Sequence, residues 1–543
     1  MSALGLYFHT VRHLRPIQVV SRGWLKLRRP RPDLRAAPPL RALTGRYVEP
    51  IAPHPSLVAP DTFRFLNLER RCTRPEDWRP ADVAALWTYN LHYFDDLNAR
   101  DAAGRAAWHR ALLQRWVAEN PVGEGVGWQP YPVSRRIVSW VKATLCGRTL
   151  PAACVESLAV QARWLSQRLE YHLLGNHLLM NAKALLHAGL YFDGRKAGAR
   201  AERGLAILRK QIREQVLADG AHFELSTMYH AAVLEDLLDI VNILRAYARP
   251  VPDDWLAAIA RMRQWLRTMT HPDGGIAFFN DAAFGIAPTA AELEAYCARL
   301  GLPPVKDRPG TLAVLEPSGF VRASAGEACL ICDCAAVGPD YLPAHAHADT
   351  LSFELSLGKQ RLLVNSGTSR YGVDEERARQ RGTAAHNTVV VDGQDSSEMW
   401  GGFRVARRAR VSGRVAEHKG DVVVIEASHD GYRRLPGRNR HRRRWTLGPQ
   451  SLQIEDQVSG RRRSAEAFFH VHSAVSARKD GLGRVLLEWS GGSATMTFEN
   501  AAEVELRPGT WHPEFGVSLP NQRVVARFDA PALSTRIDWT VSG

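Results

Sequence analysis

The spacing of apolar residues changes sharply near residue 305, and this change restricts the folds open to the chain. Before it, apolar residues recur at helical spacing in seven segments, at 106–119, 135–145, 154–171, 177–192, 200–216, 227–248 and 254–269. Pro and Gly separate these segments. Consecutive helices with short links form antiparallel hairpins, and several hairpins in series can curve into an incomplete α/α toroid.

After residue 305 the pattern becomes short alternating runs rich in β-branched residues, at 312–324, 351–367, 386–393, 421–428, 484–492 and 493–500. Such runs predict a large antiparallel sandwich. We therefore predict a multidomain α plus β protein, with an N-terminal incomplete (α/α) toroid at 46–305 followed by a C-terminal antiparallel β-sandwich at 306–543. An all-helical part followed by an all-strand part predicts two domains that meet at a cleft. Residues 1–45 form a basic arm for which the sequence predicts no fold.

The chain carries a formal net charge of +15, from 71 Lys and Arg against 56 Asp and Glu. This excess favours a polyanionic partner such as nucleic acid, acidic lipid or acidic polysaccharide, although codon usage in a GC-rich genome gives the same composition. We expect no nucleic acid, because no recognisable binding module is present. We also expect no membrane span and no secretory signal, which predicts a cytoplasmic protein.

Three clusters of unusual residues lie at or near predicted helix starts. In GWQPYPVSRR (127–136), Ser134 is the expected N-cap and Arg135 opens the helix. In GNHLLMN (175–181), Asn176 is the expected cap. In FELSTMYH (223–230), Ser226 is the expected cap and Tyr229 falls in the first turn.

Asn176 and Tyr229 are separated by one predicted helical hairpin, which would place both at the same rim of a toroid. Helix N-termini there would direct partial positive charge at a common space and hold an anion such as a sugar carboxylate. The same field would make Tyr229 easier to ionise. The simpler alternatives stay open: Asn176 as a cap only, and Tyr229 as a half-buried aromatic residue.

The segment AHAHADTLSFEL (344–355) has the alternation of a strand, which would place His345, His347 and Asp349 on one face. On a face directed at the core, these groups must be paired, bound to a metal or part of a site. His386 and Asn365 could complete a metal shell with His347, although an amide oxygen is a poor zinc ligand.

With these motifs the chain resembles the heparinase II/III-like family. The stretches that carry the resemblance are WTYNLHYFDDL (87–97), GWQPYPVSRRIVSW (127–140), NHLLMNAKAL (176–185), DGAHFELSTMYH (219–230), HAHADTLSFEL (345–355) and HNTVVVDG (386–393). The resemblance implies an (α/α) toroid joined to an antiparallel β-sandwich, with the active site between them.

The resemblance also implies roles for individual residues. Asn176 would bind and neutralise a uronate carboxylate, and Tyr229 would serve as base, acid or both, with His345 as its proton-transfer partner. The expected substrate-binding residues are Arg135, His177, Gln129 and Glu224. His347 matches a metal-binding position, and Asn365 stands where the family has a metal-binding Asp. A structural zinc or calcium ion is therefore in doubt, and the chemistry itself requires no cofactor.

The sequence thus predicts a polysaccharide lyase that cleaves a uronic-acid-containing acidic polysaccharide by β-elimination, with a possible link to capsule or exopolysaccharide metabolism. A proton next to a neutralised carboxylate can be removed by a positioned Tyr or His. No paired carboxylates stand out, which disfavours a glycosidase. A uronyl C5-epimerase and a non-catalytic glycan-binding protein of a polysaccharide assembly system remain alternatives. Most characterised relatives are exported, so a periplasmic or exported location also stays open.

Overall fold

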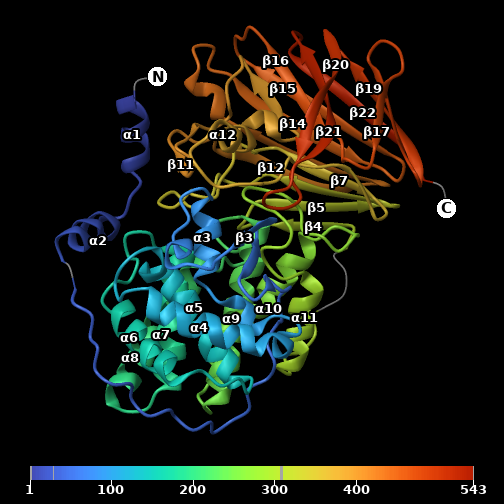
Figure 1. Cartoon of the computed structure of the whole chain (residues 1–543). Coiled ribbons are helices and arrows are strands. Elements are labelled where there is room, and N and C mark those ends of the chain that lie inside the picture. Colours follow the sequence, from blue (N-terminus) through green and yellow to red (C-terminus); the bar gives the residue numbers. More distant parts are fainter. Residues whose placement is uncertain (1–2, 29, 306–309, 542–543) are drawn as a thin grey trace.

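The computed structural model describes residues 3–28, 30–305 and 310–541. Its helical part confirms all seven predicted helical segments, with ends that shift by a few residues. The helices are α3 (Ala85–Leu91), α4 (Ala106–Glu119), α5 (Pro130–Leu145), α6 (Ala152–Leu165), α7 (Gly175–Tyr191), α8 (Arg195–Gln215), α9 (Thr227–Ala246), α10 (Asp253–Thr268) and α11 (Ala290–Arg299). The long helix α7 packs against α5, α6, α8 and α9 (Figure 1).

The strand part consists mainly of three antiparallel sheets. A five-stranded sheet contains, in order, β4 (Leu312–Leu315), β5 (Phe320–Ala325), β6 (Ala328–Asp333), β7 (Phe353–Leu357) and β8 (Gln360–Leu363). An eight-stranded sheet has the order β12 (Val411–Lys419), β13 (Val422–His429), β14 (Arg440–Leu447), β15 (Ser451–Ser459), β22 (Ala532–Val541), β19 (Gly492–Glu499), β18 (Arg484–Trp489) and β17 (Ser476–Lys479). A four-stranded sheet has the order β20 (Glu503–Trp511), β21 (Leu519–Phe528), β16 (Ala465–His470) and β9 (Val389–Val391).

The five-stranded sheet joins the two domains, because both of its faces are buried. On β6, Cys329 and Ile331 belong to an apolar cluster that also contains Trp265 of α10. Leu330, one residue along the strand, faces the other way into the core of the sandwich. Successive side chains of a strand point to opposite faces, so a continuous apolar run serves two cores at once. Figure 1 shows this sheet between the helices and the remaining strands.

The N-terminal residues contain structure that the sequence did not predict. The arm forms α1 (Ala3–Val11) and α2 (Pro16–Leu27), and the extended chain after α2 then runs along the outside of the helical domain (Figure 1). A small sheet of β1 (Leu57–Ala59), β2 (Thr62–Phe65) and β3 (Leu68–Arg71) follows. The prediction of an all-helical domain before residue 305 is therefore wrong here, because these strands are too short to show a periodicity. The predicted boundary between 305 and 306 adjoins 306–309, which lie outside the described residues.

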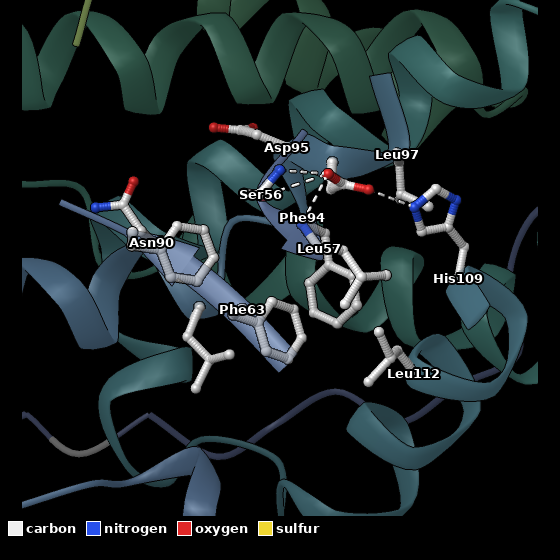
Figure 2. A pocket seen from close by; sticks show the side chains of 12 residues that line it. Ser56, Leu57, Phe63, Asn90, Phe94, Asp95, Leu97, His109 and Leu112 are labelled. Carbon is white, nitrogen blue, oxygen red and sulfur yellow. Dashed lines mark hydrogen bonds and ion pairs between the residues drawn. The ribbon is translucent and has the colours of Figure 1, made fainter. Parts of the chain in front are cut away.

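One buried carboxylate connects the small sheet to the helices. Asp96 accepts hydrogen bonds from the backbone N–H groups of Ser56 (2.6 Å) and Leu57 (3.0 Å), and its other oxygen lies 2.7 Å from His109 Nε2 (Figure 2). Asp95, the preceding residue, turns away and pairs instead with Arg135. The pocket in Figure 2 has room for about 20 Å³, roughly one water molecule, so it is a packing gap rather than a ligand site.

The centre of the helical domain contains a buried charge network. Asp239 of α9 accepts from Lys142 of α5 (2.9 Å) and from Lys183 of α7 (2.6 Å), and Tyr296 of α11 donates to its other oxygen (3.0 Å). Lys183 also pairs with Asp236 at 2.8 Å. Burial alone would favour the neutral acid, but the two lysines hold the pKa of Asp239 below its usual range. One carboxylate therefore ties four helices together.

No helix among the described residues is both long and apolar enough to cross a bilayer.

Asp239→Asn should destabilise the chain by about 3–5 kcal/mol, because it leaves two buried lysines without their shared counter-charge. Urea unfolding followed by circular dichroism measures the loss. Asp538→Asn is the matched control, because Asp538 is 47% exposed and pairs with Arg536 at the surface. Its removal should cost at most about 1 kcal/mol. Equal losses in the two variants would contradict the role given to the buried network.

Candidate active site

A buried carboxylate, Asp281, lies at the centre of the contact between the two domains. It comes from the loop between α10 and α11, and its partners come from the strand domain. His345 Nδ1 and His347 Nε2 each lie 2.9 Å from one of its oxygens, and Thr368 donates at 3.2 Å. Arg377 of α12 (Glu375–Arg381) donates through both terminal nitrogens, one of them at 2.8 Å. Asp281 therefore orients both histidines.

The charge of Asp281 is stabilised despite its complete burial. Burial by itself opposes ionisation, but Arg377 and the two histidines hold the pKa of Asp281 well below its usual range. An ionised Asp281 accepts a hydrogen bond from Nδ1 of His345, so we infer that Nε2 is the nitrogen free to exchange a proton. This is the imidazole orientation that proton transfer requires.

The predicted strand at 344–355 is wrong for most of its length, since β7 begins only at Phe353. The preceding residues form a loop in which Leu351 has a φ of 62°, a value that no strand allows. His345 and His347 nevertheless converge on one carboxylate. Asp349 does not join them: it accepts the backbone N–H of Asn280 at 2.8 Å, and burial raises its pKa. Residue types alternate in this segment, but burial does not: residues 346–357 are all buried, and those up to 352 form a folded loop.

Tyr229 lies directly against His345. Their ring centroids are 3.8 Å apart with an interplanar angle of 31°. Ser226 caps α9 by accepting the backbone N–H of Tyr229, as predicted, so Tyr229 sits in the first turn. The expectation that the helix field makes Tyr229 easier to ionise is wrong. Burial, together with the nearby Asp281, raises the pKa of Tyr229 well above its usual value.

Three residues of this cluster escaped the sequence analysis: Asp281, Arg377 and Tyr371. The hydroxyl of Tyr371 lies 2.9 Å from that of Tyr229, and the Arg377 guanidinium lies over the Tyr371 ring at 5.0 Å. All three sit outside the periodic segments that the sequence analysis used. Only their residue types in FNDAAFG and SRYGVDEERARQR could have indicated them.

Glu224 closes the other side of His345. Its Oε2 lies 3.5 Å from His345 Nε2, while Oε1 has no hydrogen-bond partner in the described chain. The side chain is 3% exposed, and burial raises its pKa, with the charges of His345 and His177 acting in the opposite direction. A carboxyl with a raised pKa next to an imidazole can share a proton with it.

Asn176 lies at the start of α7, next to Glu224. The helix begins at Gly175 and is preceded by Leu174, so the prediction that Asn176 is the cap is wrong. A Cβ on Gly175 would lie 3.1 Å from Glu224 Oε1, which shows how closely the start of α7 approaches that carboxyl. The half-buried side-chain amide of Asn176 makes no hydrogen bond to any described residue, whereas its backbone N–H is directed at Glu224 and acts to lower the pKa of that carboxyl. The side-chain amide is available to a ligand.

His177, the next residue, pairs with Glu170. Its Nδ1 lies 3.2 Å from Glu170 Oε1, and its ring lies 4.5 Å from that of Tyr131. Burial opposes protonation, but Glu170 outweighs it and raises the pKa of His177. An imidazole whose protonation Glu170 favours therefore accompanies the neutral Asn176 amide at the start of α7.

The start of α5 holds two more of the predicted residues. Gln129 precedes the helix and accepts from the Tyr89 hydroxyl. Arg135 pairs with Asp95 at 2.6 Å, so a substrate carboxylate would have to share it. Ser134 is not the cap, because the two prolines start the helix four residues earlier, and its hydroxyl instead donates to the Pro130 carbonyl.

The three predicted metal ligands lie together, but they fit a cation poorly. His347 Nδ1 and His386 Nε2 are 3.3 Å apart. The oxygen of Asn365 accepts the backbone N–H of Asn387 at 3.2 Å, and its amide donates to the Phe278 carbonyl. Within the described ranges, no three His, Cys, Asp or Glu side chains are grouped to hold an ion. The site offers two imidazoles and one neutral oxygen that is already engaged.

Comparison with known proteins agrees with the fold. A model of the heparinase II/III N-terminus matches residues 98–294, and a model of the heparinase II/III-like C-terminal region matches residues 307–540. The crystal structure of heparinase III has a TM-score of 0.72 over 86% of this chain and 79% of its own, at 18% identity. A chondroitin AC lyase of Streptomyces coelicolor has a TM-score of 0.51 over 84% of this chain and 74% of its own, at 11% identity.

Two curated relatives are similar in sequence. FtsZ-localized protein C of Caulobacter vibrioides is 26% identical over 86% of this chain and 84% of its own length. A heparin-sulfate lyase of Pedobacter heparinus is 26% identical over 52% of this chain and 47% of its own length. The family models, together with a heparin-sulfate lyase among the sequence relatives, define a protein of the polysaccharide lyase class. The chain belongs to the heparinase II/III-like family.

Glu224→Gln should gain stability relative to the wild type as the pH rises from 4 to 8. Below the usual carboxyl pKa of 4.5, Glu224 is neutral in both the folded and the unfolded chain. At higher pH the unfolded chain ionises first, so wild-type stability falls until the raised folded pKa is passed. Gln has no such loss.

Urea unfolding of both proteins across this range measures the difference. Glu455→Gln, at an exposed position of β15, is the reference for removing one carboxyl. A difference between Glu224→Gln and wild type that stays constant with pH would contradict the raised pKa.

Proposed function

We propose that the chain is a polysaccharide lyase that cleaves a uronic-acid-containing acidic polysaccharide by β-elimination. The observation that carries this proposal is the Tyr229–His345 stack, 3.8 Å between ring centroids, beside the free amide of Asn176. Elimination needs a group that neutralises the sugar carboxylate and groups that move a proton. The family membership supports the same reaction class.

In this proposal the start of α7 binds the carboxylate. Three groups there favour an anion: the Asn176 side-chain amide, the His177 imidazole, whose pKa is raised by Glu170, and the N-terminal N–H groups of α7. Their positive field stabilises the enolate-like charge that forms when the neighbouring proton leaves. Arg135 and Gln129, at the start of α5, would contact a more distant part of the sugar chain.

Proton transfer falls to the stacked pair. His345, held through Nδ1 by Asp281, presents Nε2 as the base. The raised pKa of Tyr229 keeps its hydroxyl protonated, which suits it to donate a proton to the leaving glycosidic oxygen. The hydrogen bond to Tyr371 positions that hydroxyl. Glu224 faces the same imidazole nitrogen and can relay the abstracted proton.

Tyr229→Phe and His345→Ala should each lower kcat on a cleaved substrate by about 10²–10⁴-fold, because each removes a proton-transfer group. The measurement is absorbance of the 4,5-unsaturated product formed from a panel of uronate polysaccharides. Tyr247→Phe is the matched control, because Tyr247 follows the far end of α9, about 27 Å from Tyr229 along the helix. Wild-type turnover in either site variant would refute the assignment.

A uronyl C5-epimerase would use the same residues, because it abstracts the same proton and returns one to the opposite face. Incubation in deuterated water separates the two reactions. Deuterium at C5 without chain cleavage would replace the lyase proposal by the epimerase. Polymer binding without cleavage or exchange across the panel would instead support a non-catalytic glycan-binding role. We retain this alternative because the name of one relative, FtsZ-localized protein C, states a localisation and no enzymatic activity.

We also propose that His347 and His386 bind a structural metal ion. The proposed reaction does not need this ion. Asn365→Asp should raise zinc retention after dialysis, because it replaces a neutral oxygen by a charged ligand. His386→Ala should remove the zinc that wild type retains. Elemental analysis by mass spectrometry gives the zinc content of each purified variant. Equal zinc in all three proteins would show that these residues do not form a metal site.

A further inference from the structure

A strongly basic groove lies beside the loop at 344–352, which carries His345. It has a volume of about 860 Å³. Its walls come from the link between α1 and α2, the turn before β5, the stretch 334–340, residues 407–414 at the start of β12 and residues 430–438 after β13. Eight arginines and two aspartates line it. Neither Tyr229, His345, Asn176 nor Glu224 is among the lining residues, so the groove is separate from the candidate active site.

Much of this positive charge is not neutralised. Arg414 pairs with Glu316, and Arg407 and Arg434 pair with Glu398. The exposed side chains of Arg410 and Arg433, by contrast, make no hydrogen bond or ion pair with any described residue. Exposed cations gathered in a concave surface create a positive potential that attracts anions.

The buried and partly unpaired guanidinium of Arg408 indicates a specific anion-binding site rather than a chance grouping of surface arginines. Its side chain is only 8% exposed, and one terminal nitrogen donates to Asp340 at 2.6 Å. Its Nε and its other terminal nitrogen are buried and have no hydrogen-bond partner in the described chain. Buried donors without partners are costly, and an acceptor bound in the groove would satisfy them. A guanidinium can hold a carboxylate or sulfate through two parallel hydrogen bonds.

The pKa of His13 is also affected by the positive charge of the groove. Burial lowers the pKa of His13, and the charges of Arg408, Arg12 and Arg410 lower it further. Asp340 acts in the opposite direction but does not cancel them. The groove therefore disfavours one more positive charge at its rim.

The groove packs directly against the loop at 344–352, which carries His345. Val337 and Ala409, both in its lining, form one apolar cluster with Ala346, the neighbour of His345. A Cβ on Gly338, whose φ is 84°, would lie 3.8 Å from the Glu224 carbonyl oxygen. Gly338, in the groove lining, therefore lies next to the segment that holds Glu224.

We propose that this groove is a second binding site for an acidic oligosaccharide, read through its carboxylate or sulfate groups. The groove lining contains no Phe, Tyr or Trp among the described residues, which disfavours the base stacking of single-stranded nucleic acid. The choice of a saccharide among polyanions rests on the function proposed above, whereas the anion site rests on Arg408, Arg410 and Arg433. The groove would hold a second segment of polymer while another occupies the active site.

The test compares two double variants that each remove two positive charges. Arg410→Gln with Arg433→Gln changes the groove. Arg478→Gln with Arg484→Gln is the matched control, because β17 and β18 lie at the edge of the eight-stranded sheet opposite to β12, about 30 Å away. Binding of fluorescently labelled uronate and sulfated decasaccharides is measured by anisotropy at several salt concentrations, with Tyr229→Phe in every protein to prevent turnover.

The groove variant should bind at least about tenfold more weakly, with a shallower dependence of affinity on salt, while the control keeps the parent affinity. A further Arg408→Gln variant should also weaken binding. Equal affinity in groove and control variants, or no binding by the parent, would overturn the proposal. Tighter groove binding of a single-stranded DNA of equal charge would reassign the site to nucleic acid. Product absorbance with the wild type tests the lyase function independently of all these results.

Discussion

The geometry of the candidate site depends on the buried carboxylate of Asp281. The helical domain supplies this residue, and the strand domain supplies His345, His347, Thr368 and Arg377 around it. An ionised carboxylate without water must have several donors, so its burial forces these side chains to one point. The same demand fixes the relative position of the domains and the orientation of the imidazole next to Tyr229.

Burial, rather than the helix field, sets the proton affinities around this point. Tyr229 sits in the first turn of α9, where the helix dipole favours an anion, yet its pKa is raised. The field falls off within the first turn and is worth about 1 kcal/mol, whereas loss of solvent can shift a pKa by several units. The result is a neutral phenol and a carboxyl that resists ionisation, on either side of one imidazole. Proton transfer within this group creates an ion pair and leaves the net charge of the site unchanged.

The arginines of the chain fall into two groups: buried ones that neutralise internal carboxylates, and exposed ones that give the surface its positive charge. Arg377 and Arg443 are buried beside Asp281 and Asp456 and carry no surface charge. Arg410 and Arg433 are exposed in the basic groove. A basic composition therefore says little by itself, because the same residue type serves as an internal counter-charge and as a surface cation.

The sequence by itself determined the architecture. Helical spacing up to residue 269 and strand alternation after 312 both follow from which side chains must be buried, and the observed helices and strands match them. It also identified Tyr229, His345, Asn176 and Glu224, which the structure brings together at one place. Tyr229 carries a local signal in the Ser226 cap, and His345 carries one in the repeated histidines of its segment. Glu224 and the role of Asn176 came from the family resemblance.

Only the tertiary structure decided how those residues work. Asp281 lies in a loop of the helical domain, whereas Tyr371 and Arg377 lie about 90 residues later, in a loop and in α12. No local pattern shows that these segments will meet a histidine across a domain boundary. The loop at 344–352 resembles a strand only in its alternating residue types, because residue types do not fix the backbone dihedrals and residues 346–352 are all buried. Protonation states also depend on burial, which exists only once the two domains have closed over Asp281.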